Sequence, residues 1–106
     1  MALPTLTPEQ RQAALEKATA ARRVRAEVKL RLKTSAATLA EVIGEARVNE
    51  VVAKLRVVDL LLAMPGVGKV RAQDIMQRIG IAESRRLRGL GVHQVDALIQ
   101  EFAGRG

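Results

Sequence analysis

The chain contains no cysteine, tryptophan or tyrosine, and Phe102 is its only phenylalanine. The absence of cysteine excludes a disulfide framework and any thiolate metal site. The near absence of aromatic side chains leaves no platform on which single-stranded bases could stack. Phe102 itself falls in an apolar pattern typical of a core, so single-stranded nucleic acid is not the expected ligand.

Groups that perform catalysis are equally scarce. His93 is the only histidine, and Ser35 and Ser84 are the only serines. The sequence puts no plausible base beside either serine, and His93 falls near the start of a helix, where it is expected to be solvated. We therefore expect a protein that is not an enzyme and that uses no catalytic residue, no metal and no cofactor.

Long hydrophobic runs are also missing. The longest, residues 60–65, is far too short to cross a bilayer. The first ten residues lack the basic-then-apolar layout of a signal peptide. These features predict a protein of the cytoplasm with no membrane partner.

Positive charge is abundant by contrast. The 106 residues carry a net charge of +7, with an isoelectric point near 11.1. Such values favour nucleic acid or another acidic surface as the partner. Residues 1–40 hold eight Lys and Arg against three Asp and Glu, and residues 66–91 hold six against two. Basic patches are often only solvated surface, so the charge alone leaves both interpretations open.

Helical signals begin near the N-terminus. Thr7, Pro8 and Gln10 fit a capping box with proline at the first helical position, and nothing breaks the helical pattern until about Lys33. The half of this helix before residue 21 has little to bury and is expected to fray or be disordered. The second half carries an apolar docking stripe at helical spacing, formed by Ala21, Val24, Val28 and Leu32.

Several shorter helices are expected in the rest of the chain. They cover about 38–46, a turn starting at Asn49, the apolar residues around 60–64, and 68–79. A compact segment at 81–91, anchored by Leu87 and Leu90, leads to a last helix over about 92–103. The residues expected to be buried by that helix are Val92, Val95, Leu98, Ile99 and Phe102.

No segment shows the alternation of a strand. The sequence therefore predicts an all-α protein in which a long N-terminal helix precedes a small helical domain. We expect two parts, a basic N-terminal helix or arm over 1–36 and a globular helical domain over 37–106.

Gly66 and Gly68 separate an apolar run from the helix expected at 68–79. Glycine ahead of a helix lets a partner approach the backbone and leaves the first N–H groups free. Because these groups lie at the positive end of the helix dipole, they form a site for an anion such as phosphate. Lys69 and Arg71 follow on the first helical turn. Three further arginines come later in the same basic region: Arg85, Arg86 and Arg88.

Two nucleotide-binding motifs fail at this position. A P-loop would need a glycine at Ala63 and a hydroxyl at Val70, and a dinucleotide-binding fingerprint would need a glycine at Arg71. The helix-hairpin-helix pattern fits instead, through Met64, Pro65, Gly66, Val67, Gly68, Ala72 and Ile75. A Gly-Val-Gly turn is also common as a structural helix C-cap, and this alternative stays open.

A resemblance to known families extends these observations. After the hairpin pattern come Ile79-Gly80-Ile81, a polar stretch, the three arginines and a helix rich in apolar residues. This order resembles the helix–two-turn–helix module of a small-subunit ribosomal protein and of formamidopyrimidine-type DNA glycosylases. The segments MALPTLTPEQRQAALEKATAARR, MPGVGKVRAQDIM and ESRRLRGLG resemble the integration host factors of mycobacterial and streptomycete type.

That resemblance implies a nucleoid-associated protein that binds duplex DNA with weak sequence preference, organises the chromosome and assists phage site-specific integration. It implies contact with the phosphate backbone or minor groove through Gly66, Val67, Gly68, Lys69, Arg71, Arg85, Arg86 and Arg88. Duplex DNA is thus the expected partner, a phage integrase is a further one, and we expect a monomer located in the nucleoid.

Two alternatives remain at this point. A row of basic residues beside the docking stripe is either a second DNA-binding surface or a solvated face; it consists of Arg22, Arg23, Arg25 and Lys29. The alternative function is an RNA-binding ribosomal-protein-like module. Such proteins usually carry a long basic C-terminal tail, whereas this sequence ends FAGRG and carries its basic arm at the N-terminus.

Overall fold

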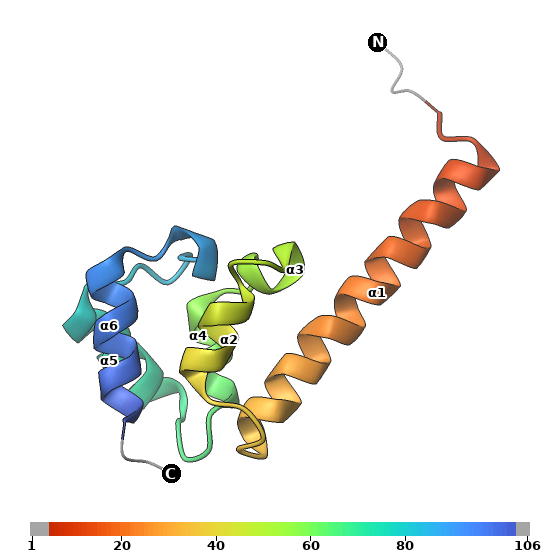
Figure 1. The fold of residues 1–106 in the computed structure, drawn as a ribbon. Helices are drawn as coiled ribbons and strands as arrows, with labels where there is room; N and C mark the ends of the chain where they lie inside the picture. Colours follow the sequence, from red (N-terminus) through yellow and green to blue (C-terminus); the bar gives the residue numbers. More distant parts are fainter. Residues whose placement is uncertain (1–4, 104–106) are drawn as a thin grey trace.

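The computed structural model describes residues 5–103, and this part of the chain is helical without any strand (Figure 1). Its elements are α1 (Pro8–Lys33), α2 (Leu39–Glu45), α3 (Glu50–Ala53), α4 (Val57–Ala63), α5 (Lys69–Ile79), the 3₁₀ turn η1 (Leu87–Gly89) and α6 (Val92–Phe102). The predicted all-α fold with a long N-terminal helix is confirmed. Residues 1–4 and 104–106, which the two expected domain ranges include, lie outside the described residues.

Helix α1 begins at the predicted capping box. The Thr7 hydroxyl accepts from the Gln10 N–H at 3.1 Å, and the Gln10 side-chain oxygen accepts from the Thr7 N–H at 2.9 Å. The N-terminal half, expected to fray, is instead helical from Pro8 onward, and it extends away from the rest of the molecule (Figure 1). Its side chains are exposed, including Leu15 at 56%. The cap and the high alanine content favour this helix in the absence of packing.

The C-terminal half of α1 belongs to the core. Val28 and Leu32 are each only 1% exposed, and the helix packs on α3 and α4. An ion pair between Arg31 and Glu45, 2.9 Å long, ties α1 to α2. The hydrophobic core therefore crosses residue 36, where the sequence suggested a boundary between arm and domain.

Helix α4 lies at the centre of the molecule, since Leu60 and Leu61 are fully buried. Helix α5 covers it with Ala72, Ile75 and Met76, which lie on one face at helical spacing. Burying such side chains stabilises the fold by about 1.5–3 kcal/mol for each large one. In the described part of the chain, no helix has both the length and the apolar character needed to span a membrane.

Helix α6 is less buried than its apolar pattern suggests. Leu98 is fully buried, while Val95 and Ile99 are partly exposed and pack against the core from outside. Val92, expected to be buried, is 76% exposed, and that prediction was wrong. Val92 is the first residue of α6 and lies at the rim of the core, where it borders a shallow hollow instead of filling it.

Two turns connect α5 to α6. Gly80 ends α5 in the left-handed conformation, at φ +86°, so that its N–H and that of Ile81 both donate to the Met76 carbonyl at 2.8 Å. Leu87 is buried and anchors the second turn, and Leu90 is half-buried. The Gln94 side chain donates to the Gly80 carbonyl at 3.0 Å and closes the module.

Candidate nucleic-acid interface

The turn between α4 and α5 is built around Gly66 and Val67. Gly66 has φ +76°, a left-handed conformation that favours glycine. The Val67 side chain is 6% exposed, and its N–H donates to the Met64 carbonyl at 3.2 Å. Val67 therefore anchors the turn against the core, and its expected contact with phosphate stays a prediction.

The N-terminus of α5 presents free backbone N–H groups. The first helical bond runs from the Ala72 N–H to the Gly68 carbonyl at 2.9 Å. Within the described residues, no acceptor faces the N–H groups of residues 68–71, and Gly68 has no side chain to cap them. We call these four N–H groups the α5 amide site.

Charge distinguishes α5 from the helices before it. Helices α1 to α4 each carry an acidic residue in the first turn, namely Glu9, Glu41, Glu50 and Asp59. Helix α5 has none and carries Lys69 and Arg71 instead. Cations at the positive end of a helix dipole are unfavourable unless an anion binds between them. The α5 amide site is therefore electrostatically suited to a phosphate.

A second cationic surface lies at residues 85–89, which we call the arginine turn. Arg85, Arg86 and Arg88 are exposed and border a shallow hollow of about 280 Å³ together with Ala82, Ser84 and Gly89. The Arg85 guanidinium donates to the Gly89 carbonyl at 3.0 Å, which braces the turn. Within the described residues, the Arg86 and Arg88 side chains make no hydrogen bond or ion pair and remain available to an anion.

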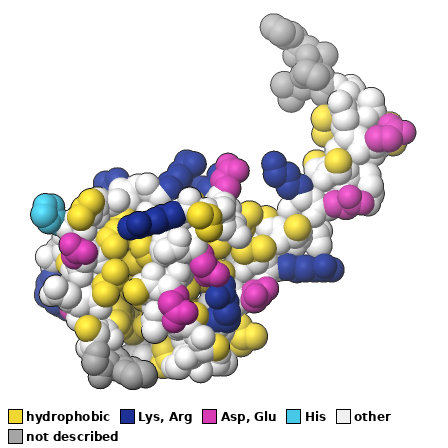
Figure 2. All heavy atoms as spheres, in the orientation of Figure 1, with side chains coloured by type: hydrophobic (Ala, Val, Ile, Leu, Met, Phe, Trp, Pro, Cys, Tyr) yellow, Lys and Arg dark blue, Asp and Glu magenta, His cyan; other side chains and the backbone are white. Residues whose placement is uncertain are grey.

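The segment that leads into the arginine turn folds back on α5. The Gln73 side chain donates to Glu83 at 3.3 Å, so the segment entering the arginine turn folds back over Gln73. Lys69 is one helical turn before Gln73 and shares its face. Figure 2 shows Lys and Arg side chains along the upper edge of the globular part.

Sequence analysis missed one residue of this surface, Arg56. Residues 55–57 pair with 85–87 in a short antiparallel bridge, which brings Arg56 opposite Arg86. The two arginines are thirty positions apart in the sequence, and no local pattern marks their pairing. Only an apolar residue on each side of Arg56 indicated that its side chain would point outward.

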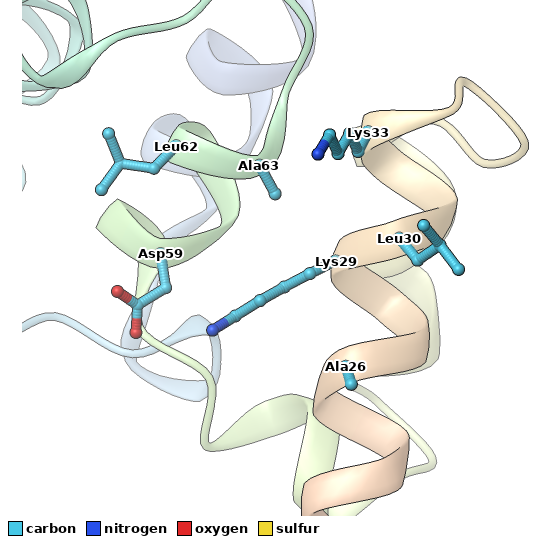
Figure 3. A pocket seen from close by; sticks show the side chains of 7 residues that line it. All are labelled: Ala26, Lys29, Leu30, Lys33, Asp59, Leu62 and Ala63. Carbon is cyan, nitrogen blue, oxygen red and sulfur yellow. The ribbon is translucent and has the colours of Figure 1, made fainter.

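The basic row on α1 is divided by the fold. Arg22 and Arg23 are exposed, while Arg25 is partly buried. Lys29 borders a groove of about 430 Å³ between α1 and α4, where it extends toward Asp59 without forming an ion pair (Figure 3). Of this row, Arg22 and Arg23 are therefore best placed to meet a partner in solution.

Arg78, which lies near the site, has a structural role. Arg78 forms an ion pair with Glu101 at 2.8 Å, which joins α5 to α6, and a second one with Asp74 at 2.9 Å within α5. The hydrogen bond from Arg78 lowers the pKa of Glu101, and the bonds to Glu101 and Asp74 raise the pKa of Arg78. Arg78 is thus occupied within the protein and is not part of the candidate interface.

No cluster of His, Cys, Asp and Glu able to hold a metal occurs among residues 5–103. What the site offers is backbone N–H groups and guanidinium groups facing outward, with no aromatic side chain among them. Such a surface can bind consecutive phosphates along a nucleic-acid backbone without contacting the bases.

The chain is similar to one protein family and to several characterised proteins. Residues 32–102 match the S13-like H2TH domain family. The whole chain is 62% identical to the integration host factor of Streptomyces coelicolor, covering 99% of that protein. Over 96% of the chain it is 57% identical to the integration host factors of Mycolicibacterium smegmatis and Mycobacterium tuberculosis, covering 97% of each. A solved structure of sIHF bound to an 8 bp palindromic DNA matches 83% of this chain and 99% of its own, with a TM-score of 0.81 and 59% identity.

Proposed function

Because this chain belongs to the integration host factor family, we propose that it binds duplex DNA through the α5 amide site and the arginine turn. The observation that carries this proposal is the N-terminus of α5, where unpaired N–H groups lie beside Lys69 and Arg71 with no acidic residue in the first turn. The arginine turn extends the same cationic surface. The sIHF relative, solved with DNA, supports the choice of ligand.

Each group has a role in this binding. The N–H groups of Gly68 and its successors donate to a phosphate oxygen, and Lys69 neutralises part of its charge. The Arg86 and Arg88 side chains, which make no hydrogen bond or ion pair within the described residues, reach neighbouring phosphates or the minor groove. Arg85 contributes charge while its hydrogen bond holds the arginine turn in shape. Since these are backbone contacts, the sequence preference should be weak.

The biological role follows from the family. We propose a non-catalytic protein of the cytoplasm that acts as a monomer in the nucleoid, organises the chromosome and assists phage integration together with an integrase. The exposed Arg22 and Arg23 on α1 supply a second DNA-binding surface in this proposal. Arg22 and Arg23 would then contact the duplex beyond the footprint of the globular part.

A titration with three ligands tests the ligand class. Duplex DNA, single-stranded DNA and structured RNA of equal length are compared at several salt concentrations. Duplex should bind most tightly, with a log–log salt slope of roughly −4 to −5 if about five cations displace counterions. Tighter binding to single strands or to structured RNA than to duplex would overturn the proposal, and an RNA preference would favour the ribosomal-protein-like alternative.

A further inference from the structure

The short bridge between residues 55–57 and 85–87 brings two like charges together. The Val57 N–H donates to the Arg85 carbonyl at 3.0 Å, and the Leu87 N–H donates to the Leu55 carbonyl at 2.9 Å. These two bonds flank the pair formed by Arg56 and Arg86, which is therefore a non-hydrogen-bonded antiparallel pair. Directly opposite residues of this kind have Cα atoms about 4.5 Å apart, closer than in the hydrogen-bonded kind.

The pleat of the bridge decides where these side chains point. Leu55, Val57 and Leu87 are 3%, 2% and 6% exposed and belong to the core. Because side chains alternate along extended backbone, the arginines between them point to the opposite side, and both are exposed. Arg56 and Arg86 thus leave the surface side by side, on the same face.

Nothing in the described part of the chain neutralises this pair. The ion pairs among residues 5–103 involve Arg31, Lys54 and Arg78, and neither Arg56 nor Arg86 donates a side-chain hydrogen bond. Like charges directly opposite one another destabilise an antiparallel pair. Two guanidinium groups held at this separation would gain from an anion between them, which could accept charge-assisted hydrogen bonds from both.

We propose that Arg56 and Arg86 together hold one phosphate of the DNA backbone. This inference rests on the proposed function, and it adds a residue from the start of α4 to a surface otherwise formed by the α5 amide site and the arginine turn. Arg86 belongs to both parts, since it also borders the hollow beside Arg88. The bridge therefore adds one phosphate-binding position to the cationic surface.

The variants Arg56→Gln and Arg86→Gln and their double test the proposal, with Arg11→Gln as a matched control. Arg11 is an exposed arginine near the N-terminal end of α1. This end of α1 extends away from the other helices (Figure 1). Arg56→Gln should weaken duplex affinity by roughly tenfold near 0.1 M salt and flatten the salt slope by about 0.9, whereas Arg11→Gln should leave the slope unchanged. The double variant should lose less than the product of the two single losses, because both remove the same contact.

Thermal unfolding without DNA separates this role from a structural one. At low salt, Arg56→Gln should unfold at the same or a higher temperature than the unmodified protein, since a repulsion is removed. Inorganic phosphate at constant ionic strength should raise the unfolding temperature of the unmodified protein more than that of Arg56→Gln. Three results would each contradict the proposal that the two arginines share one phosphate. They are a lower unfolding temperature of Arg56→Gln, an unchanged salt slope of its DNA binding, and affinity losses in the double variant that equal the product of the single losses.

The two levels of inference can fail separately. If the unmodified protein does not bind duplex DNA, the proposed function is wrong, and the comparison with inorganic phosphate still decides whether the arginine pair binds an anion. If the unmodified protein binds duplex DNA and Arg56→Gln binds it equally well, only the arginine pair is wrong.

Discussion

Gly66 and Gly68 lie two residues apart in the same turn, and the backbone requires glycine at only one of them. Gly66 has φ +76°, a conformation that side chains disfavour. Gly68 has φ −93° and ψ −178°, which is ordinary extended backbone, and no atom lies within 4 Å of the place where its Cβ would be. The fold therefore explains Gly66, while the ligand is the better explanation for Gly68.

Replacing Gly68 by Asp should abolish most DNA binding without harming the fold. Asp is a favoured N-cap residue, so the variant should unfold at the same or a higher temperature. Its carboxylate would occupy the α5 amide site and repel phosphate, which should reduce duplex affinity by at least about tenfold. Lys69→Ala leaves the N–H groups free, and its loss should be smaller, about 1 kcal/mol. A folded Gly68→Asp variant that binds like the unmodified protein would make the turn a structural C-cap only.

Replacing Gly66 by Ala should act on stability first. A left-handed residue with a side chain costs about 1–2 kcal/mol, so the free energy of unfolding should fall by that amount in denaturant titrations. Gly44→Ala is a matched control, because Gly44 lies within α2 with open space around its Cβ position. There alanine should stabilise by about 0.5–1 kcal/mol. Equal effects of the two substitutions would contradict the distinction.

Replacing Arg85, Arg86 and Arg88 by Ala together should flatten the salt dependence of duplex binding. Each lost phosphate contact lowers the log–log slope by about 0.9, so the triple variant should lose up to about 2.7. Circular dichroism checks that the helices remain, since Arg85 also braces the turn through the Gly89 carbonyl. A folded triple variant with an unchanged slope would move the interface away from the arginine turn.

Replacing Arg22 and Arg25 by Ala should weaken duplex binding without eliminating it, because the α5 amide site and the arginine turn remain. Arg25 is partly buried, so Arg22 should account for more of the loss when each is changed alone. Affinities for one duplex, measured at a single salt concentration, decide this. No change in the double variant would mean that the basic face of α1 is only solvated.

Acid should weaken the junction between α5 and α6. The hydrogen bond from Arg78 lowers the pKa of Glu101 below its ordinary value near 4.5. A carboxylate whose pKa is lowered by folding stabilises the protein above its unfolded pKa, and this contribution disappears as the pH falls through the folded value. Glu101→Gln should therefore be less stable than the unmodified protein at pH 7, and the difference should shrink below about pH 4. A constant difference from pH 7 to pH 3 would exclude this ion pair as the cause.

The local elements were predictable because their causes are local. Capping residues such as Thr7 and Asn49 act within one helical turn, and each begins a helix as predicted. The buried face of α5 follows from residues three and four apart in its sequence. Of the candidate site, the free N–H groups before Ala72 follow from the same local logic.

Features that depend on distant contacts were not predictable in this way. Val92 fits the apolar pattern of α6, yet it is 76% exposed because no other segment of the described chain covers it. Val67 lies in the predicted helix-hairpin-helix pattern, and only the fold shows that it packs against the core and that its N–H donates to the Met64 carbonyl. Lys29 belongs to the basic row on α1, and only the fold shows that it borders the groove against α4 and extends toward Asp59.

The sequence by itself determined the helices, their caps and the cationic N-terminus of α5, because hydrogen bonds and dipoles within a helix involve residues only a few positions apart. The tertiary structure decided which cations lie together. The core holds Leu55 and Leu87 side by side, and the backbone bridge between them places Arg56 opposite Arg86. That arrangement depends on packing between segments about thirty residues apart, and no pattern along the chain specifies it.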